Sequence, residues 1–169
     1  MLSLLAAAAS LAEFEATLAA QDSATAALRQ WCELRHIAAP ANIRATRVGG
    51  SQAIAPADLR RRLKVRRHET LAFRHVRLTC GQTVMSEAYN WYVPSRLTPA
   101  MNAALDTSDT PFGTVAAPLR FRRQRLGSER ARCLQGTILA HRARLMLPGG
   151  RPLAMLVECY TPANLTAGN

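Results

Sequence analysis

The sequence predicts an α+β fold in which an antiparallel β-sheet carries helices packed on one face. Helical patterns dominate the start of the chain, and strands joined by turn residues follow. Apolar residues make up 49% of the 169 residues, which is typical of a folded globule. No internal repeat and no linker divides the chain. Residues 1–169 are therefore expected to form a single domain.

Hydrophobic spacing and turn residues place the individual elements. Apolar side chains recur at helical spacing in two segments, of which the first is either an N-terminal helix or the remnant of an export signal. Asp22-Ser23 can cap the second. The expected helices span about 2–20, 24–37, 56–64 and 98–105, and the expected strands span about 43–48, 70–79, 83–93, 132–147 and the last arm of a hairpin over 141–162.

This last hairpin contains one charge in an apolar pattern. Its turn is Pro148-Gly149-Gly150, and strand alternation in the second arm puts Glu158 on a face with Ala154 and Leu156. A carboxylate buried there costs several kcal/mol unless a cation or a donor meets it. Arg74 interrupts an apolar stripe in the strand 70–79 in the same way, so we expect it to be the partner of Glu158. The two interpretations are a ligand site in an apolar cavity and a structural ion pair.

Other side chains near this pair depend on details that the sequence leaves open. A hairpin loop of two or four residues puts His141 opposite Glu158, whereas a loop of three residues puts Arg142 there. Glu87 and Tyr89 share a face of the strand 83–93 with other large side chains. We consider both candidates for the pocket, although Glu87 could instead be a cross-strand partner for an arginine.

The charge balance favours anionic partners. The net charge is +11, from 22 basic and 11 acidic residues. Neither zinc-finger spacing nor an RNA-binding aromatic motif nor a basic zipper accompanies the arginines. We therefore expect a solvated basic surface, and binding of nucleic acid by the arginines is the weaker alternative. The chain also has no run of apolar residues of membrane-spanning length, and a cytoplasmic location is expected, with export to the periplasm as the alternative.

The cysteines and the short motifs predict neither a metal nor a cofactor. Cys32, Cys80, Cys133 and Cys159 are widely spaced and form no CxxC. Free buried thiols are the preferred interpretation, and two disulfides are the alternative for an exported protein. GxGxxG, P-loop, HExxH and GxSxG motifs are all absent from the sequence.

Several segments together resemble chorismate pyruvate-lyase, the bacterial enzyme that makes 4-hydroxybenzoate, and the superfamily that it shares with effector-sensing domains of helix-turn-helix regulators. The resemblance extends from about Asp22 to Pro162, with the segments in the order of that family. These segments are DSAT (22–25), RHVRL (74–78), YVP (92–94), TPFG (110–113), RARL (142–145) and LVE (156–158).

This resemblance implies roles for particular residues. The family's strand arginine, which holds the ring carboxylate, corresponds to Arg74, and its late glutamate, which contacts the hydroxyl end of the ring, corresponds to Glu158. Ala24, Phe112 and Gly113 correspond to positions that line the site. The sequence departs from the enzyme here, because the enzyme has Met in place of Ala24 and Leu in place of Phe112.

The implied activity is a cofactor-free elimination of pyruvate from chorismate or a related carboxylate to give a hydroxybenzoate. Arg74 would bind one carboxylate, Arg142 or Arg144 would balance the second, and Glu158 would be the catalytic acid–base or orienting group. The alternative is a non-catalytic protein of the same fold that binds a small aromatic carboxylate. In both cases the expected partner is a small anionic aromatic or pre-aromatic carboxylate.

Overall fold

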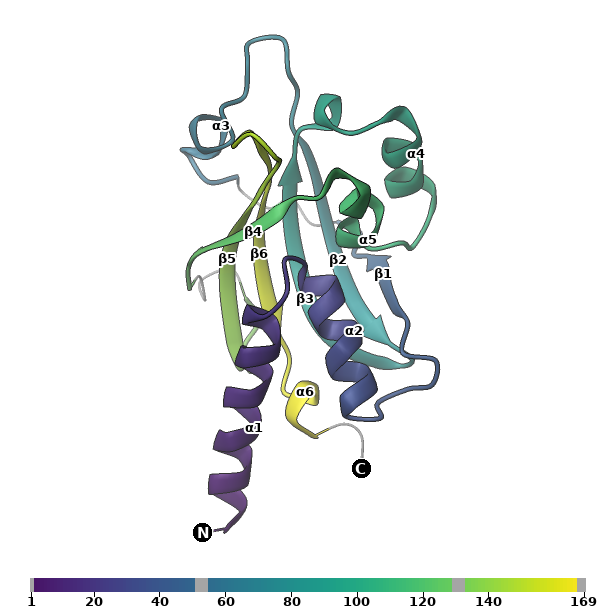
Figure 1. The fold of residues 1–169 in the computed structure, drawn as a ribbon, viewed down its shortest axis with the longest axis vertical. Coiled ribbons are helices and arrows are strands. Elements are labelled where there is room, and N and C mark those ends of the chain that lie inside the picture. The colour runs from purple at the N-terminus through teal and green to yellow at the C-terminus, as the bar shows by residue number, and fades with distance from the viewer. Residues whose placement is uncertain (1, 51–54, 129–132, 167–169) are drawn as a thin grey trace.

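The computed structural model contains one six-stranded antiparallel β-sheet with helices against it (Figure 1), so the predicted α+β class is confirmed. Residues 2–50, 55–128 and 133–166 are described by the structure. The strand order is β1-β2-β3-β6-β5-β4, and every neighbouring pair runs antiparallel. Strands β4 and β1 therefore form the two edges of the sheet.

The elements have the following bounds. The strands are β1 (Ile43–Arg47), β2 (Ala72–Cys80), β3 (Thr83–Tyr92), β4 (Arg122–Gly127), β5 (Leu139–Met146) and β6 (Pro152–Tyr160). The helices are α1 (Leu2–Ala19), α2 (Ala24–Leu34), α3 (Leu59–Arg62), α4 (Pro99–Thr107), α5 (Phe112–Ala116) and α6 (Ala163–Thr166), with short 3-10 helices η1 (Pro94–Arg96) and η2 (Ala117–Leu119).

The observed elements differ from the predicted ones in three places. Strand β4 was missed, because its sequence RRQRLG is too uniformly polar to show alternation. The strand predicted over 132–147 begins at Leu139, and residue 132 lies outside the described residues. Helix α5, which begins at Phe112, is not among the expected helices.

Two apolar clusters hold the helices on one face of the sheet. In the first, α1 and α2 pack over the β-strands through Phe14 and Trp31, whose ring centroids lie 5.2 Å apart. Helix α2 begins after Ser23, whose hydroxyl accepts a hydrogen bond from the Ala26 N–H at 3.3 Å. In the second cluster, α4 and α5 pack through Leu105 and Phe112. The two clusters leave a space between them over the middle of the sheet.

The opposite face of the sheet has a smaller cover. Leu59 and Leu63, in and just after α3, pack there with Trp91, Met155 and Val157. Helix α3 is therefore the exception to the placement of the helices on one face.

The four cysteines form two disulfides, so the expectation of free thiols is wrong. Cys32–Cys80 joins α2 to the end of β2, with a Cα–Cα distance of 6.4 Å. Cys133–Cys159 joins the segment before β5 to β6, with a Cα–Cα distance of 5.5 Å. Among the described helices, none has both the length and the apolar character needed to cross a membrane.

A buried ion network connects α3, η1 and the β5–β6 turn. Glu69 accepts hydrogen bonds from Arg96 Nε at 3.1 Å, from Arg96 Nη2 at 2.6 Å and from Arg151 Nη2 at 2.6 Å. Arg96 also donates to the carbonyl oxygen of Leu63 at 2.7 Å and to that of Lys64 at 2.9 Å. The hydrogen bonds from Arg96 hold the pKa of Glu69 far below its usual range. Every charge in this network is thus matched by a partner.

We expect Glu69→Ala to lower the free energy of unfolding by about 3–5 kcal/mol, because it leaves Arg96 buried without its carboxylate. The matched control is Asp109→Ala, which removes an exposed carboxylate from Arg44 and should cost no more than about 1 kcal/mol. Urea unfolding of both variants measures the difference. Equal losses would show that the Glu69 network does not hold these elements together.

Candidate functional site

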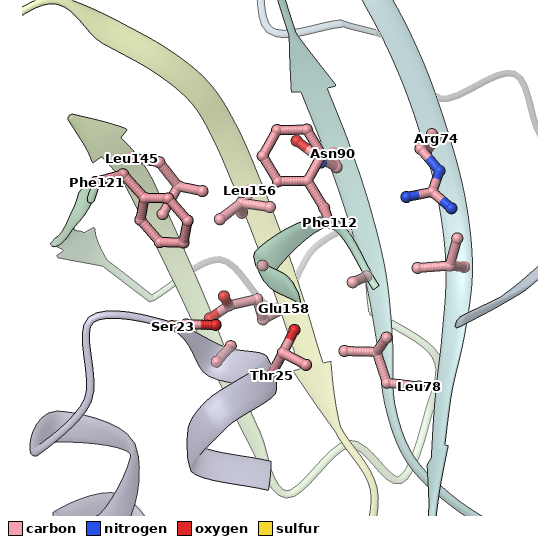
Figure 2. A pocket seen from close by; sticks show the side chains of 14 residues that line it. Ser23, Thr25, Arg74, Leu78, Asn90, Phe112, Phe121, Leu145, Leu156 and Glu158 are labelled. Carbon is pink, nitrogen blue, oxygen red and sulfur yellow. The ribbon is translucent and has the colours of Figure 1, made fainter. Parts of the chain in front are cut away.

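A cavity of about 50 Å³ lies between the two apolar clusters, on the helical face of β2, β3 and β6 (Figure 2). Its walls come from the sheet, from the start of α2 and from the start of α5. The lining residues are Ser23, Ala24, Thr25, Arg74, Val76, Leu78, Ala88, Asn90, Phe112, Gly113, Phe121, Leu145, Leu156 and Glu158.

Five of the residues predicted for the site line this cavity, namely Arg74, Glu158, Ala24, Phe112 and Gly113. Figure 2 shows Arg74 on β2 at one side of the cavity and Glu158 on β6, beyond the intervening strand β3. The close approach of α5 to α2 depends on Gly113. A Cβ at this position would collide with the side chain of Ser23 and would lie 2.9 Å from Thr25 Oγ1. That these residues bind a ligand stays a prediction.

Arg74 is a buried cation without a partner among the described residues. Its residue surface is 4% exposed, and neither Nε nor Nη2 has a hydrogen-bond acceptor. Burial lowers the pKa of Arg74, and the nearby positive charge of Arg47 lowers it further. Because an arginine in a protein stays protonated, the charge persists and is available to an anion.

Asn90 was not predicted as a site residue. It is the cross-strand neighbour of Arg74 on β3 and is 3% exposed. Both Oδ1 and Nδ2 lack a hydrogen-bond partner within the described part of the chain. Each such buried group costs about 1–3 kcal/mol when it is left unpaired. Asn90 could have been identified as a polar amide on the same inward-facing side of β3 as Ala88.

The partner of Glu158 is Arg123, so the predicted pairing with Arg74 is wrong. Arg123 Nη2 contacts Oε2 of Glu158 and Arg123 Nε lies 3.4 Å from Oε1, while the Tyr160 hydroxyl donates to Oε2 at 2.9 Å. Burial lowers the pKa of Arg123, but the charge and hydrogen bonding of Glu158, together with Tyr160, outweigh this effect and raise the pKa. Arg123 belongs to β4, the strand that the sequence pattern did not reveal. Glu158 therefore forms a structural ion pair with Arg123 and also faces the cavity.

The register of the hairpin places His141 directly opposite Glu158. His141 Nδ1 lies 3.2 Å from Arg123 Nη2. Because arginine only donates, Nδ1 accepts and the ring proton belongs on Nε2. Burial lowers the pKa of His141 to about 4, so the ring is neutral at pH 7. His141 thus lies behind Glu158 and is not among the residues that line the cavity.

Arg142 and Arg144 do not reach the cavity, in contrast to the prediction. Their cross-strand partners are Val157 and Met155, whose side chains lie on the opposite face of the sheet. Arg144 Nη2 donates to Gln124 Oε1 at 2.8 Å on that face. With His141 opposite Glu158, strand alternation necessarily turns both arginines away.

Glu87 and Tyr89 also lie on the opposite face and do not line this cavity. Glu87 Oε1 lies 2.5 Å from His75 Nε2, and the His75 ring stacks on Tyr89 with centroids 4.2 Å apart. Arg77 Nε approaches Glu87 Oε2 at 3.9 Å. The alternative interpretation, in which Glu87 is a cross-strand partner of an arginine, describes this cluster.

The fold and the site define an α+β protein with a mostly apolar cavity, and this cavity contains a buried arginine that has no partner among the described residues. The chain is 37% identical over 173 residues to the uncharacterized protein y4mC of Sinorhizobium fredii, covering 89% of this chain and 73% of that protein. The chain therefore belongs to the same family as y4mC. No protein-family model matches it.

The solved structures that resemble the chain have TM-scores below 0.5. The ligand-binding domain of a regulator assigned to the GntR family, from Bordetella bronchiseptica, aligns with 72% of this chain and 83% of its own at 15% identity and a TM-score of 0.44. A gene product from Staphylococcus aureus aligns with 71% of this chain and 84% of its own at 10% identity and a TM-score of 0.49. Neither likeness is evidence about the ligand or the activity of this protein.

Glu158 and Arg123 should depend on each other for stability. We expect Arg123→Met to lower the free energy of unfolding by about 3–5 kcal/mol, because the carboxylate of Glu158 is left buried and unpaired. Combining it with Glu158→Gln should recover about 2 kcal/mol relative to the sum of the single changes.

Arg144→Met is the matched control for this cycle, because Arg144 lies on the other face of the sheet. Its effect should add to that of Glu158→Gln within about 0.5 kcal/mol. Urea unfolding of the five variants tests both statements. Additive losses for Arg123 and Glu158 would contradict the ion pair.

Proposed function

We propose that this protein binds a small ring carboxylate in the cavity, with Arg74 holding the carboxylate group. The unpaired guanidinium of Arg74, buried at the end of a mostly apolar cavity, is the single observation that carries the proposal. A buried charge without a counter-ion is strongly unfavourable, and a bidentate carboxylate would supply both the charge and the acceptors that Nε and Nη2 lack. The apolar side chains around it suit a ring.

Entry of a ring requires the cavity to widen. Its volume of about 50 Å³ is smaller than the ~150 Å³ of an apolar cavity that takes benzene. The two largest apolar side chains of the lining are those of Phe121 and of Phe112, which is the first residue of α5. We propose that Phe112 moves aside when the ligand enters, because it stands at the end of a short helix and next to the loop that precedes it.

The number of available cations favours a ligand with one carboxylate. Among the described residues that line the cavity, Arg74 is the one that carries a positive charge. Arg123 is engaged by Glu158, and Arg144 lies on the other face. Chorismate has two carboxylates, so a second one would enter without a counter-ion from the described lining. Binding of a monocarboxylate is accordingly our first proposal.

Turnover of the chorismate lyase type is the second candidate, and the position of Glu158 across the cavity from Arg74 favours it (Figure 2). Strands β2 and β6 are separated by β3, so their backbones lie about 10 Å apart, which leaves room for a ring between the two side chains. In this reaction the C4 proton leaves the ring, the bond to the enolpyruvyl oxygen breaks, pyruvate departs and the ring becomes aromatic. Glu158 would accept the proton or orient the ring, and Arg74 would hold the ring carboxylate.

Benzoate and 4-hydroxybenzoate should stabilise the protein in a thermal-shift series. At ten times the Kd, binding to the native state alone adds about 1.4 kcal/mol, which corresponds to a rise in Tm of about 3–6 °C. Arg74→Gln should abolish the shift, whereas Arg44→Gln, which removes an exposed arginine from β1, should leave it unchanged. A shift that survives Arg74→Gln would place the ligand elsewhere.

The lyase candidate is tested by an absorbance assay for hydroxybenzoate formed from chorismate. If Glu158 takes part in proton transfer, Glu158→Gln should reduce turnover by roughly 10²- to 10⁴-fold and should leave ligand binding in place. Wild-type protein without turnover would exclude this candidate and leave the binding proposal standing. Turnover that Glu158→Gln does not change would remove Glu158 from the mechanism.

A further inference from the structure

We infer that the ligand of this cavity carries an N–H donor on the ring atom next to its carboxylate, as 2-aminobenzoate does, and that Asn90 recognises this group. The inference rests on the proposed function, because it requires Arg74 to hold the carboxylate. It adds a specificity-determining residue and a class of ligand.

The pairing of β2 with β3 brings Arg74 and Asn90 together. Arg74 and Asn90 are directly opposite each other in the ladder, so their Cβ atoms are about 4.5–5.5 Å apart and their side chains leave the same face. Both side chains line the cavity, and both are more than nine-tenths buried. A group bound by Arg74 therefore lies within reach of the Asn90 amide.

The donors and acceptors of Arg74 and Asn90 show which hydrogen-bonding group a ligand would have to supply. Arg74 has donors only, and the Asn90 amide has donors on Nδ2 and an acceptor at Oδ1. The donors of both residues can converge on one carboxylate. Oδ1 of Asn90 still lacks a donor, and no described residue supplies one. A ligand that binds at Arg74 can satisfy Oδ1 only if it carries an N–H or O–H beside its carboxylate.

Three kinds of neighbouring donor can be distinguished chemically. A hydroxyl ortho to a ring carboxylate directs its single hydrogen to that carboxylate and has none left for Oδ1. An aromatic amine in the same position has two hydrogens, so one can bond internally while the other reaches Asn90. The ammonium group of an aliphatic amino acid would add a second positive charge beside Arg74 in a region of low dielectric, which is unfavourable. The aromatic 2-amino acid is the class that fits.

The test compares 2-aminobenzoate with 2-methylbenzoate, which has nearly the same shape and no donor, by isothermal titration calorimetry on the full chain. Wild-type protein should bind 2-aminobenzoate roughly three- to tenfold more tightly, the factor that one net hydrogen bond provides. Asn90→Leu removes the amide at similar volume, and the ratio of the two Kd values should fall to about one. Thr25→Val removes a different polar group from the same lining and should preserve the ratio.

The outcomes separate this inference from the proposed function. Equal affinities in the wild type, with Arg74→Gln still abolishing binding, would overturn the role of Asn90 and leave the carboxylate site intact. A preference for the amine that persists in Asn90→Leu would also overturn it, because another group would then meet the donor. If neither compound bound, and Arg74→Gln changed nothing, both proposals would fail. The wild-type comparison needs no variant, so it holds even if Asn90→Leu does not fold.

Discussion

The guanidinium of Arg74 imposes the main constraint on this molecule, because it is a largely buried charge that forms no ion pair with any described residue. The same chain shows the usual solution at Arg96, which is equally buried and is matched by the carboxylate of Glu69 and by backbone carbonyl groups. At Arg74 the sheet, α2 and α5 enclose the side chain without matching it. Buried cations are usually stabilised by a partner, so this difference supports our proposal that Arg74 binds a ligand.

Around this charge, the polar groups of the cavity are fixed to different degrees. Glu158 is held by Arg123 and Tyr160, and neutral His141 completes the group behind it. Both carboxylate oxygens of Glu158 are bonded, whereas the buried Nε2 of His141 has no hydrogen-bond partner among the described residues. Arg74 and Asn90, on the neighbouring strands, have unused hydrogen-bonding capacity. The unpaired groups at this end of the cavity support our proposal that a ligand's polar group binds there.

Strand alternation in the sequence was sufficient to identify Arg74 and Glu158 as inward-facing charges, and turn residues were sufficient for the last hairpin. The register of that hairpin was not predictable, because loops of different length were equally compatible with Pro148-Gly149-Gly150. The structure pairs His141 with Glu158, which turns Arg142 to the other face. A shift of one residue thus decides which side chains reach the cavity.

The partner of Glu158 could not be found from the sequence for a related reason. In the segment 122–125 every residue is polar, so no periodicity marks Arg123 as inward-facing, and its charge is expected on the solvated surface. Asn90 gave a weak signal, a polar residue in an apolar stripe, but an uncharged amide is less conspicuous than a buried charge. The orientation of Arg123 depends on the pairing of β4 with β5, which is a tertiary contact. The position of Asn90 in the lining becomes evident only once the cavity is known.

The central claim is that Arg74 holds a carboxylate inside the cavity. A crystal structure of the protein with 4-bromobenzoate tests it most directly, because the anomalous signal of bromine locates the ring independently of the surrounding side chains. We expect the bromine between the sheet and α5 and the carboxylate within hydrogen-bond distance of Arg74 Nε and Nη2. Bromine found only at surface arginines, with the cavity occupied by water or by Phe112, would contradict it.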